Sequence, residues 1–108
     1  MCRTRSIQFI GMIVSALMCG QALAQERGNR DIGRSLAQRI CSECHAILER
    51  QPNSPNPLAP SFNTIANVAG MNSTALTVAL QRSHETMPNI ILDASELSNV
   101  IAYILSLR

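Results

Sequence analysis

The chain has 108 residues, a formal net charge of +2, only 3% aromatic residues and no lysine. This length allows one small domain. A charge so close to zero disfavours a nucleic-acid-binding protein and a protein held to an anionic membrane by a basic patch, since both depend on clustered cations.

Residues 1–24 have the pattern of a secretory signal peptide. A positive start is followed by a mostly apolar run over residues 7–17, and Ala22-Leu23-Ala24 matches a small-residue cleavage site. The run is shorter than the ~20 residues that a membrane span needs. We therefore predict a periplasmic protein whose mature domain is residues 25–108. The alternatives are an uncleaved N-terminal anchor and a lipid attached to Cys19.

The predicted mature domain has seven arginines and seven acidic residues, so it is formally neutral. Strong net-charge steering of a partner is therefore not expected, although a local dipole near the first predicted helix can orient docking. The arginines gathered there are Arg27, Arg30, Arg34 and Arg39. Only Cys41 and Cys44 remain as cysteines, too close together for a useful staple. A secreted domain this small then needs another source of stability, such as a bound metal or cofactor.

The first predicted helix covers residues 29–41, with Asn29 or Asp31 as its N-cap. The residues that recur at helical spacing are Ile32, Leu36, Arg39 and Ile40. Residues 51–60 contain four prolines, which exclude a helix and predict a stiff, extended loop wrapped on the domain surface.

Three further helices are predicted. Ser61 begins a short one that carries Phe62, Ile65, Ala66 and Val68 and ends at Gly70, and Asn72 or Ser73 begins the next, which carries Leu76, Val78, Ala79 and Leu80. Residues 83–91 form an irregular stretch. Asp93 and Glu96 have the spacing of a capping box, and an amphipathic stripe follows: Leu97, Val100, Ile101, Ile104 and Leu105. Since no segment alternates with period two, the predicted fold class is all-α.

The most informative motif is Cys41-Ser42-Glu43-Cys44-His45, which has the form C-x-x-C-H, the attachment signature of c-type haem. Two thiols at this spacing can each form a thioether to a haem vinyl group, and His45 can supply an axial nitrogen to the iron. The macrocycle would also provide the large apolar surface that a chain poor in aromatic residues lacks. We predict one covalently attached haem c.

Two other interpretations of the cysteine pair stay open. A thioredoxin-like dithiol belongs to an α/β fold, whereas no strand is predicted here. A zinc site would use Cys41, Cys44, His45 and His84. Three of these ligands lie within five residues, which fits a tetrahedral structural site poorly.

The second axial ligand is predicted to be Met87, because electron-transfer haems commonly pair histidine with methionine. Met87 lies in the irregular stretch directly before Pro88, where a stiffened loop can present its side chain. Met71 is assigned to core filling or to the surface. His84 is the competing ligand.

The first axial ligand also needs an orienting partner. A metal-ligating histidine normally donates its other ring N–H to an acceptor. For His45 the candidate acceptors are the backbone carbonyls of Pro60 and of Pro57, between which the sequence does not decide.

With these motifs in this order, the chain resembles the class I cytochrome c family, specifically its small bacterial periplasmic members. The residues that carry the resemblance are Gly33, Cys41, Cys44, His45, Ala59-Pro60-Ser61-Phe62, Thr86-Met87-Pro88 and Ala102-Tyr103-Ile104. It implies short helices around one haem ligated by His45 and Met87, with the first and last helices crossing where Gly33 meets Val100 and Tyr103. The absence of lysine means that the lysine-ringed docking face of mitochondrial relatives does not carry over.

The haem motif and the resemblance together predict a one-electron carrier rather than an enzyme. Its expected partners are periplasmic redox proteins, namely a dehydrogenase, an oxidase or another cytochrome. It would act either as a free carrier or as the haem subunit of such a complex. The alternative is a gas-binding or peroxide-reactive haem protein, which needs an open or labile sixth position on the iron.

Overall fold

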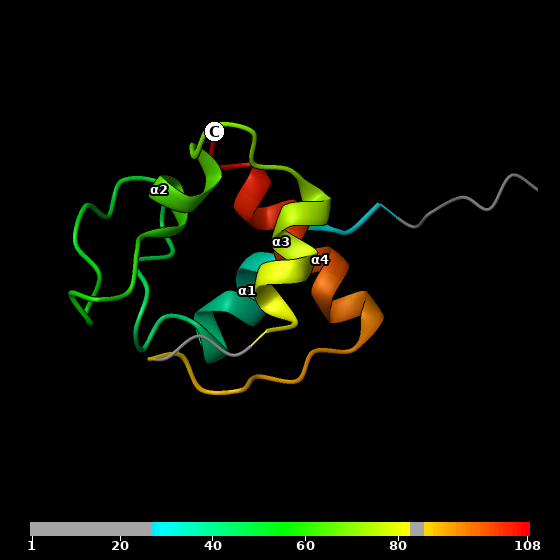
Figure 1. Ribbon diagram of the computed structural model, residues 1–108, viewed down its shortest axis with the longest axis horizontal. Helices are drawn as coiled ribbons and strands as arrows, with labels where there is room; N and C mark the ends of the chain where they lie inside the picture. The colour runs from blue at the N-terminus through cyan, green and yellow to red at the C-terminus, as the bar shows by residue number, and fades with distance from the viewer. Residues whose placement is uncertain (1–26, 83–85) are drawn as a thin grey trace, which may run out of the picture.

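The computed structural model describes residues 27–82 and 86–108. In this part of the chain it contains four α-helices: α1 (Arg30–Ile40), α2 (Phe62–Ala66), α3 (Ser73–Leu80) and α4 (Ala94–Leu105) (Figure 1). No strand occurs among the described residues, so the predicted all-α class is confirmed. None of the helices there is long and apolar enough to cross a membrane. The predicted signal peptide and His84 lie outside the described residues.

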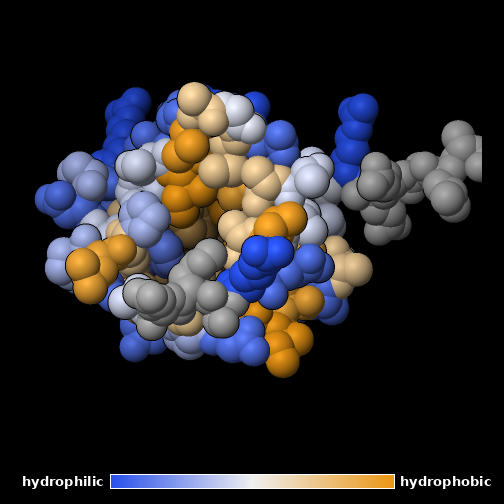
Figure 2. Space-filling view, in the orientation of Figure 1, coloured by the Kyte–Doolittle hydropathy of each residue, from blue (hydrophilic) through white to orange (hydrophobic). Residues whose placement is uncertain are grey.

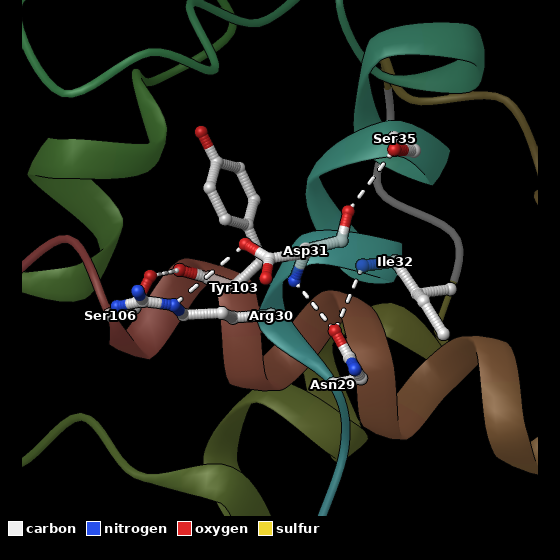
Figure 3. Close-up of polar contacts among 7 residues, drawn as sticks. All are labelled: Asn29, Arg30, Asp31, Ile32, Ser35, Tyr103 and Ser106. Carbon is white, nitrogen blue, oxygen red and sulfur yellow. Dashed lines mark hydrogen bonds and ion pairs between the residues drawn. The ribbon is translucent and has the colours of Figure 1, made fainter.

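Each helix begins at a side chain that accepts hydrogen bonds from its first free N–H groups. Asn29 caps α1, where its Oδ1 accepts hydrogen bonds from the N–H groups of Asp31 and Ile32 (Figure 3). Ser61 caps α2 and Asn72 caps α3. Asp93 and Glu96 form the predicted capping box at the start of α4. Such caps contribute about 1 kcal/mol each, and because they depend on nearby residues alone, the sequence locates them well.

The buried face of α1 differs from the predicted stripe. Gly33, Leu36 and Ala37 are the buried residues, whereas Ile32 is 55% exposed and Ile40 is 36% exposed. The reason is that α1 turns its glycine towards α4, which rotates Ile32 towards solvent. Ile32 recurs at helical spacing with Leu36, as predicted, but it does not share the burial of Leu36.

The next two helical segments also leave apolar side chains exposed to solvent. α2 ends at Ala66, ahead of Gly70, which adopts a positive φ of 77° in the turn that follows. Val68 is 51% exposed beyond the helix, and Val78 on α3 is 45% exposed. The sequence predicted Val68 and Val78 as residues carried by these two helices. Helices this short bury only one row of side chains, of which Leu76 on α3 is an example.

The first and last helices cross at Gly33, as expected. A Cβ atom placed on Gly33 would lie 1.9 Å from the carbonyl oxygen of Asn99 and 3.0 Å from the Cβ of Tyr103, so only glycine lets the two backbones approach this closely. The nearest neighbour is therefore the backbone of Asn99 and not the side chain of Val100. The buried Asn99 side chain also accepts a hydrogen bond from the N–H of Asn29 (2.7 Å), which ties the start of α1 to α4.

Tyr103 connects α4 to the chain that follows the cysteine motif. Its ring is 6% exposed and rises from α4 beside α1 (Figure 3). Its hydroxyl donates to the carbonyl oxygen of Ile47 (2.6 Å), and its ring lies 6.3 Å from that of Phe62 between centroids. Ile47 is 1% exposed, so this carbonyl has little access to water as a substitute partner.

Replacement of Tyr103 by phenylalanine is expected to lower the free energy of unfolding by about 1–3 kcal/mol at neutral pH, because it leaves the Ile47 carbonyl without its donor. Chemical denaturation of Tyr103→Phe beside the wild type measures this loss.

The same pair of proteins gives a pH test. Burial raises the pKa of Tyr103 above its ordinary value of 10.0, while Arg34 opposes the rise and Glu49 adds to it. The folded state then keeps a proton that the unfolded chain releases. The resulting stability is complete below about pH 10 and is lost as the pH rises further. Wild-type stability should therefore fall more steeply than that of Tyr103→Phe above about pH 10. Parallel alkaline profiles would contradict this account.

Candidate functional site

A cavity of about 420 Å³ opens beside α3, between α2, the loop before it and the segment before α4. Figure 2 shows apolar side chains gathered around a hollow on this face. Its volume falls within the range of sites that bury a small molecule or cofactor. The apolar part of the wall comprises Ile40, Leu58, Ala59, Phe62, Ile65, Leu76, Ala79, Leu80, Ile90 and Ile104. Among the residues that the structure describes, the ionisable side chains of the lining are those of His45, Glu43 and the two cysteines.

All five residues predicted to bind the cofactor line this one cavity. They are Cys41, Cys44, His45, Pro60 and Met87. They come from three separated segments of the chain: the end of α1, the start of α2 and the stretch before α4. The structure therefore brings together residues up to 46 positions apart in sequence.

The two cysteines are placed by the end of α1. Cys41 is the C-cap of the helix, and its carbonyl accepts from the N–H groups of Cys44 (3.2 Å) and His45 (2.9 Å), which makes a tight turn. Both thiols are free, with Cys41 8% exposed and Cys44 half-buried. The turn presents both sulfurs and the imidazole to the same cavity.

The environment of Cys41 disfavours the dithiol interpretation. Burial raises the pKa of the Cys41 thiol from 9.0 to about 11, so that it is a neutral thiol at pH 7. Reactive dithiols depend on the opposite shift, towards a stabilised thiolate.

The zinc interpretation gains no support from the described residues either. In the parts of the chain that the structure describes, no three side chains of His, Cys, Asp or Glu come together in a way that would hold a metal ion. The fourth ligand of that hypothesis, His84, lies outside these parts.

His45 is oriented by the chain before α2. Its Nδ1 lies 2.7 Å from the carbonyl oxygen of Pro60, and its ring lies 5.5 Å from that of Phe62, tilted by 48°. A carbonyl oxygen only accepts, so Nδ1 carries the proton and Nε2 keeps its lone pair. The structure thus decides between the two carbonyls that the sequence left open, in favour of Pro60 over Pro57. An imidazole held in this way has one nitrogen available to a metal.

Two thioethers line the cavity. Met87 is half-buried and followed by Pro88, which also lines it. Met71 is half-buried, packs against the core and lines the same cavity, so the assignment of Met71 to the core holds in part, although it also faces the site. The cavity therefore offers two sulfur donors besides the cysteines.

The residues present fit a haem. The thiol pair, the oriented imidazole and the thioethers are the donors that c-type haems use, and the walls around them are apolar. Most residues of the apolar wall lie on helices that the sequence predicted, but sequence reasoning missed Leu58 in the proline-rich loop and Ile90 before α4. Neither lies in a periodic stripe, and only the fold of their loops brings them to the cavity.

A second hollow, of about 470 Å³, shares no lining residue with the first. Three of the chain's arginines meet there with two carboxylates and Tyr103: Arg30, Arg34, Arg50, Asp31 and Glu49. Arg30 Nε lies 3.9 Å from Asp31 Oδ1 in an exposed ion pair (Figure 3). The carboxylates offset two of the three positive charges, so this hollow, which includes Arg30 and Arg34 of the predicted arginine cluster, is not strongly cationic.

The chain was also compared with known proteins. It is 32% identical over 97 residues to "Cytochrome c-552" of Bradyrhizobium diazoefficiens, an alignment that covers 90% of this chain and 89% of that protein. No protein-family model matches the chain. No solved structure matches it.

Proposed function

Because this chain belongs to the c-type cytochromes, we propose that it is a periplasmic class I cytochrome that carries single electrons on one covalently attached haem c with His45 and Met87 as axial ligands. The observation that carries the proposal is that Cys41, Cys44, His45 and Met87 line one apolar cavity. Haem supplies the one-electron redox chemistry when it is bound.

The chain's own residues hold and shield the cofactor. Cys41 and Cys44 anchor it through thioethers, and the turn at the end of α1 sets their separation. The Pro60 carbonyl keeps the His45 imidazole in the tautomer that leaves Nε2 free. Met87 faces the cavity as the second donor, and its thioether favours a higher reduction potential than a second imidazole would. The apolar wall excludes water, so that the ligand set changes little between the two redox states.

The proposed partners are periplasmic redox proteins that approach the mouth of the cavity. Leu58, at this mouth, is 71% exposed, and Ile91, next to the lining residue Ile90, is 88% exposed. Within residues 27–82 and 86–108, Glu43 is the carboxylate that lines the cavity, and no arginine of these residues lines it. Docking here depends on apolar contact more than on charge, in keeping with a neutral mature domain.

Electron self-exchange between two copies of the mature protein is therefore expected to respond little to salt. Its rate constant, measured by NMR line broadening in partly reduced samples, should change less than about threefold between roughly 10 and 500 mM salt. The control Glu43→Arg replaces a negative charge at the mouth by a positive one, so that each copy of the formally neutral mature domain carries a net charge of +2 and repels the other. Its self-exchange should be slower at low salt and should recover as salt is added. A strong salt dependence of the wild type would contradict an uncharged docking face.

The experiment that tests the proposed function is a set of visible spectra of the purified mature protein, oxidised, reduced and reduced under carbon monoxide. A c-type haem spectrum that carbon monoxide leaves unchanged supports a six-coordinate electron carrier. A haem spectrum that shifts readily with carbon monoxide favours the gas-binding alternative. Colourless protein from cells competent in cytochrome maturation would overturn both.

A further inference from the structure

The proline-rich loop at residues 51–60 is hydrogen-bonded to three successive residues, namely the last two of the haem motif and Ala46 directly after it. The N–H of Asn56 donates to the carbonyl of Cys44 (3.1 Å), the Nδ1–H of His45 to the carbonyl of Pro60 (2.7 Å), and the N–H of Ala46 to the Oγ of Ser54 (2.9 Å). The loop therefore folds back along the segment that presents the imidazole.

The hydrogen bond at the N–H of Ala46 is important because this residue is buried. Ala46 is 0% exposed, and its carbonyl accepts from the N–H of Phe62 (2.9 Å), so both backbone groups of this residue depend on partners within the protein. Ser54 supplies one of them with a side chain. An N–H buried in this way and deprived of its acceptor has no water to replace it.

The positions of the prolines explain how a loop without regular structure holds these contacts. Ser54 directly precedes Pro55, and Asn56 directly precedes Pro57. A residue before proline is restricted to extended conformations, so both contact residues lose freedom already in the unfolded chain. Along this stretch Ser54 and Asn56 are half-buried, whereas the two prolines that follow them are exposed. The prolines face outwards and stiffen the loop, while the polar residues between them make the contacts.

We propose that residues 51–60 form a proximal latch and that Ser54 is a positioning residue for the axial ligand His45, an inference that rests on the proposed haem function. Ser54 touches neither the cofactor nor the imidazole. It acts through Ala46, whose position sets that of the preceding His45 and thereby the hydrogen bond from Nδ1–H to Pro60. That bond raises the basicity of the ligating nitrogen, so the latch influences the reduction potential.

The test compares Ser54→Ala with Ser54→Thr, which keeps the hydroxyl, and with Ser35→Ala. Ser35 is an exposed serine of α1 that donates to the carbonyl of Asp31, away from the cavity. In the mature holoprotein, Ser54→Ala is expected to exchange the His45 Nδ1 proton about tenfold faster or more by NMR, which corresponds to a tenfold larger open population. Its midpoint potential should rise, because a weaker hydrogen bond leaves the imidazole a poorer donor to the ferric iron. Ser54→Thr should lie near the wild type, and Ser35→Ala should match it.

Equal exchange rates and potentials in Ser54→Ala and Ser35→Ala would overturn the latch, as would a threonine variant no closer to the wild type than the alanine variant. If Ser54→Ala does not accumulate, hydrogen exchange of the wild type decides: the amide protons of Ala46 and Asn56 should exchange much more slowly than that of the exposed loop residue Asn53, and equal rates would overturn the latch. If the wild type binds haem but Ser54→Ala changes neither the exchange rate nor the midpoint potential, the latch is contradicted and the proposed function is not. If the wild type binds no haem, both the proposed function and the positioning role of Ser54 are contradicted.

Discussion

A chain in which Cys41 and Cys44 are both replaced by alanine is expected to be colourless and largely unfolded. The thiols line a cavity of about 420 Å³ with apolar walls, inside a predicted mature domain of only 84 residues. At roughly 24 cal/mol per Å³, leaving such a volume unfilled costs up to about 10 kcal/mol, an upper figure because the mouth is open to water. The whole stability of a small domain is about 5–15 kcal/mol. We therefore expect the cofactor to complete the core and its two cysteine anchors to decide whether the chain folds.

The measurements are the visible spectrum and the far-ultraviolet circular dichroism of the purified variant. The matched control is Ser42→Ala, which lies between the two cysteines and keeps both thiols. Ser42 donates from the exposed surface to the carbonyl of Gln38 (2.6 Å), so its loss should cost no more than about 1 kcal/mol and leave haem incorporation intact. A double cysteine variant that is cofactor-free yet helical and cooperatively folded would show that the core does not need haem.

Replacement of Met87 by alanine is expected to have the second largest effect. Loss of the thioether leaves the sixth position of the iron to water or an added ligand, so the ferrous protein should bind carbon monoxide. The midpoint potential should fall by about 60 mV or more, which is a tenfold change in a one-electron equilibrium. The direction follows because a methionine ligand raises the potential of a c-type haem. Spectroelectrochemistry and titration with carbon monoxide measure both effects.

Met71→Ala is the matched control for Met87→Ala, since both methionines line the cavity and both are half-buried. Met71 packs against the core, so its truncation should cost stability, about 2–5 kcal/mol for a fully buried site and less here. It should not open the iron to carbon monoxide. If Met71→Ala lowers the potential and Met87→Ala does not, the assignment of the two thioethers must be exchanged.

The features that depend on short stretches of the chain could be predicted from the sequence. The cap Ser61 and the capping box of Asp93 and Glu96 were predicted, and Asn29 and Asn72 were each one of two candidates, because a cap depends on residues within one turn of it. The all-α class followed from the absence of any alternating segment. The haem motif was readable for the same reason, since its chemistry is contained in five consecutive residues.

The sequence was a poorer guide to which side of each helix is buried. Ile32 recurs at helical spacing with the buried Leu36 and yet is 55% exposed, because the close crossing at Gly33 determines which side of α1 meets α4. Val78 shows the same limit on α3. Hydrophobic spacing identifies an apolar row, but in a short helix two adjacent rows are nearly equivalent, and only packing against a neighbour selects one of them.

By itself the sequence determined the attachment motif, the helix starts and the formally neutral charge of the predicted mature domain, because each is a property of neighbouring residues or of composition. The crossing of two helices at Gly33 was implied only by the resemblance to the class I cytochrome c family, since no local pattern encodes a contact between distant helices. The tertiary structure alone decided that Pro60, and not Pro57, meets the His45 imidazole and that two methionines share the cavity. It alone decided that Ser54 holds the buried N–H of Ala46. These contacts join segments that are distant in the chain or belong to an irregular loop. Their geometry is set by how the loops pack around the cavity, and no local periodicity encodes it.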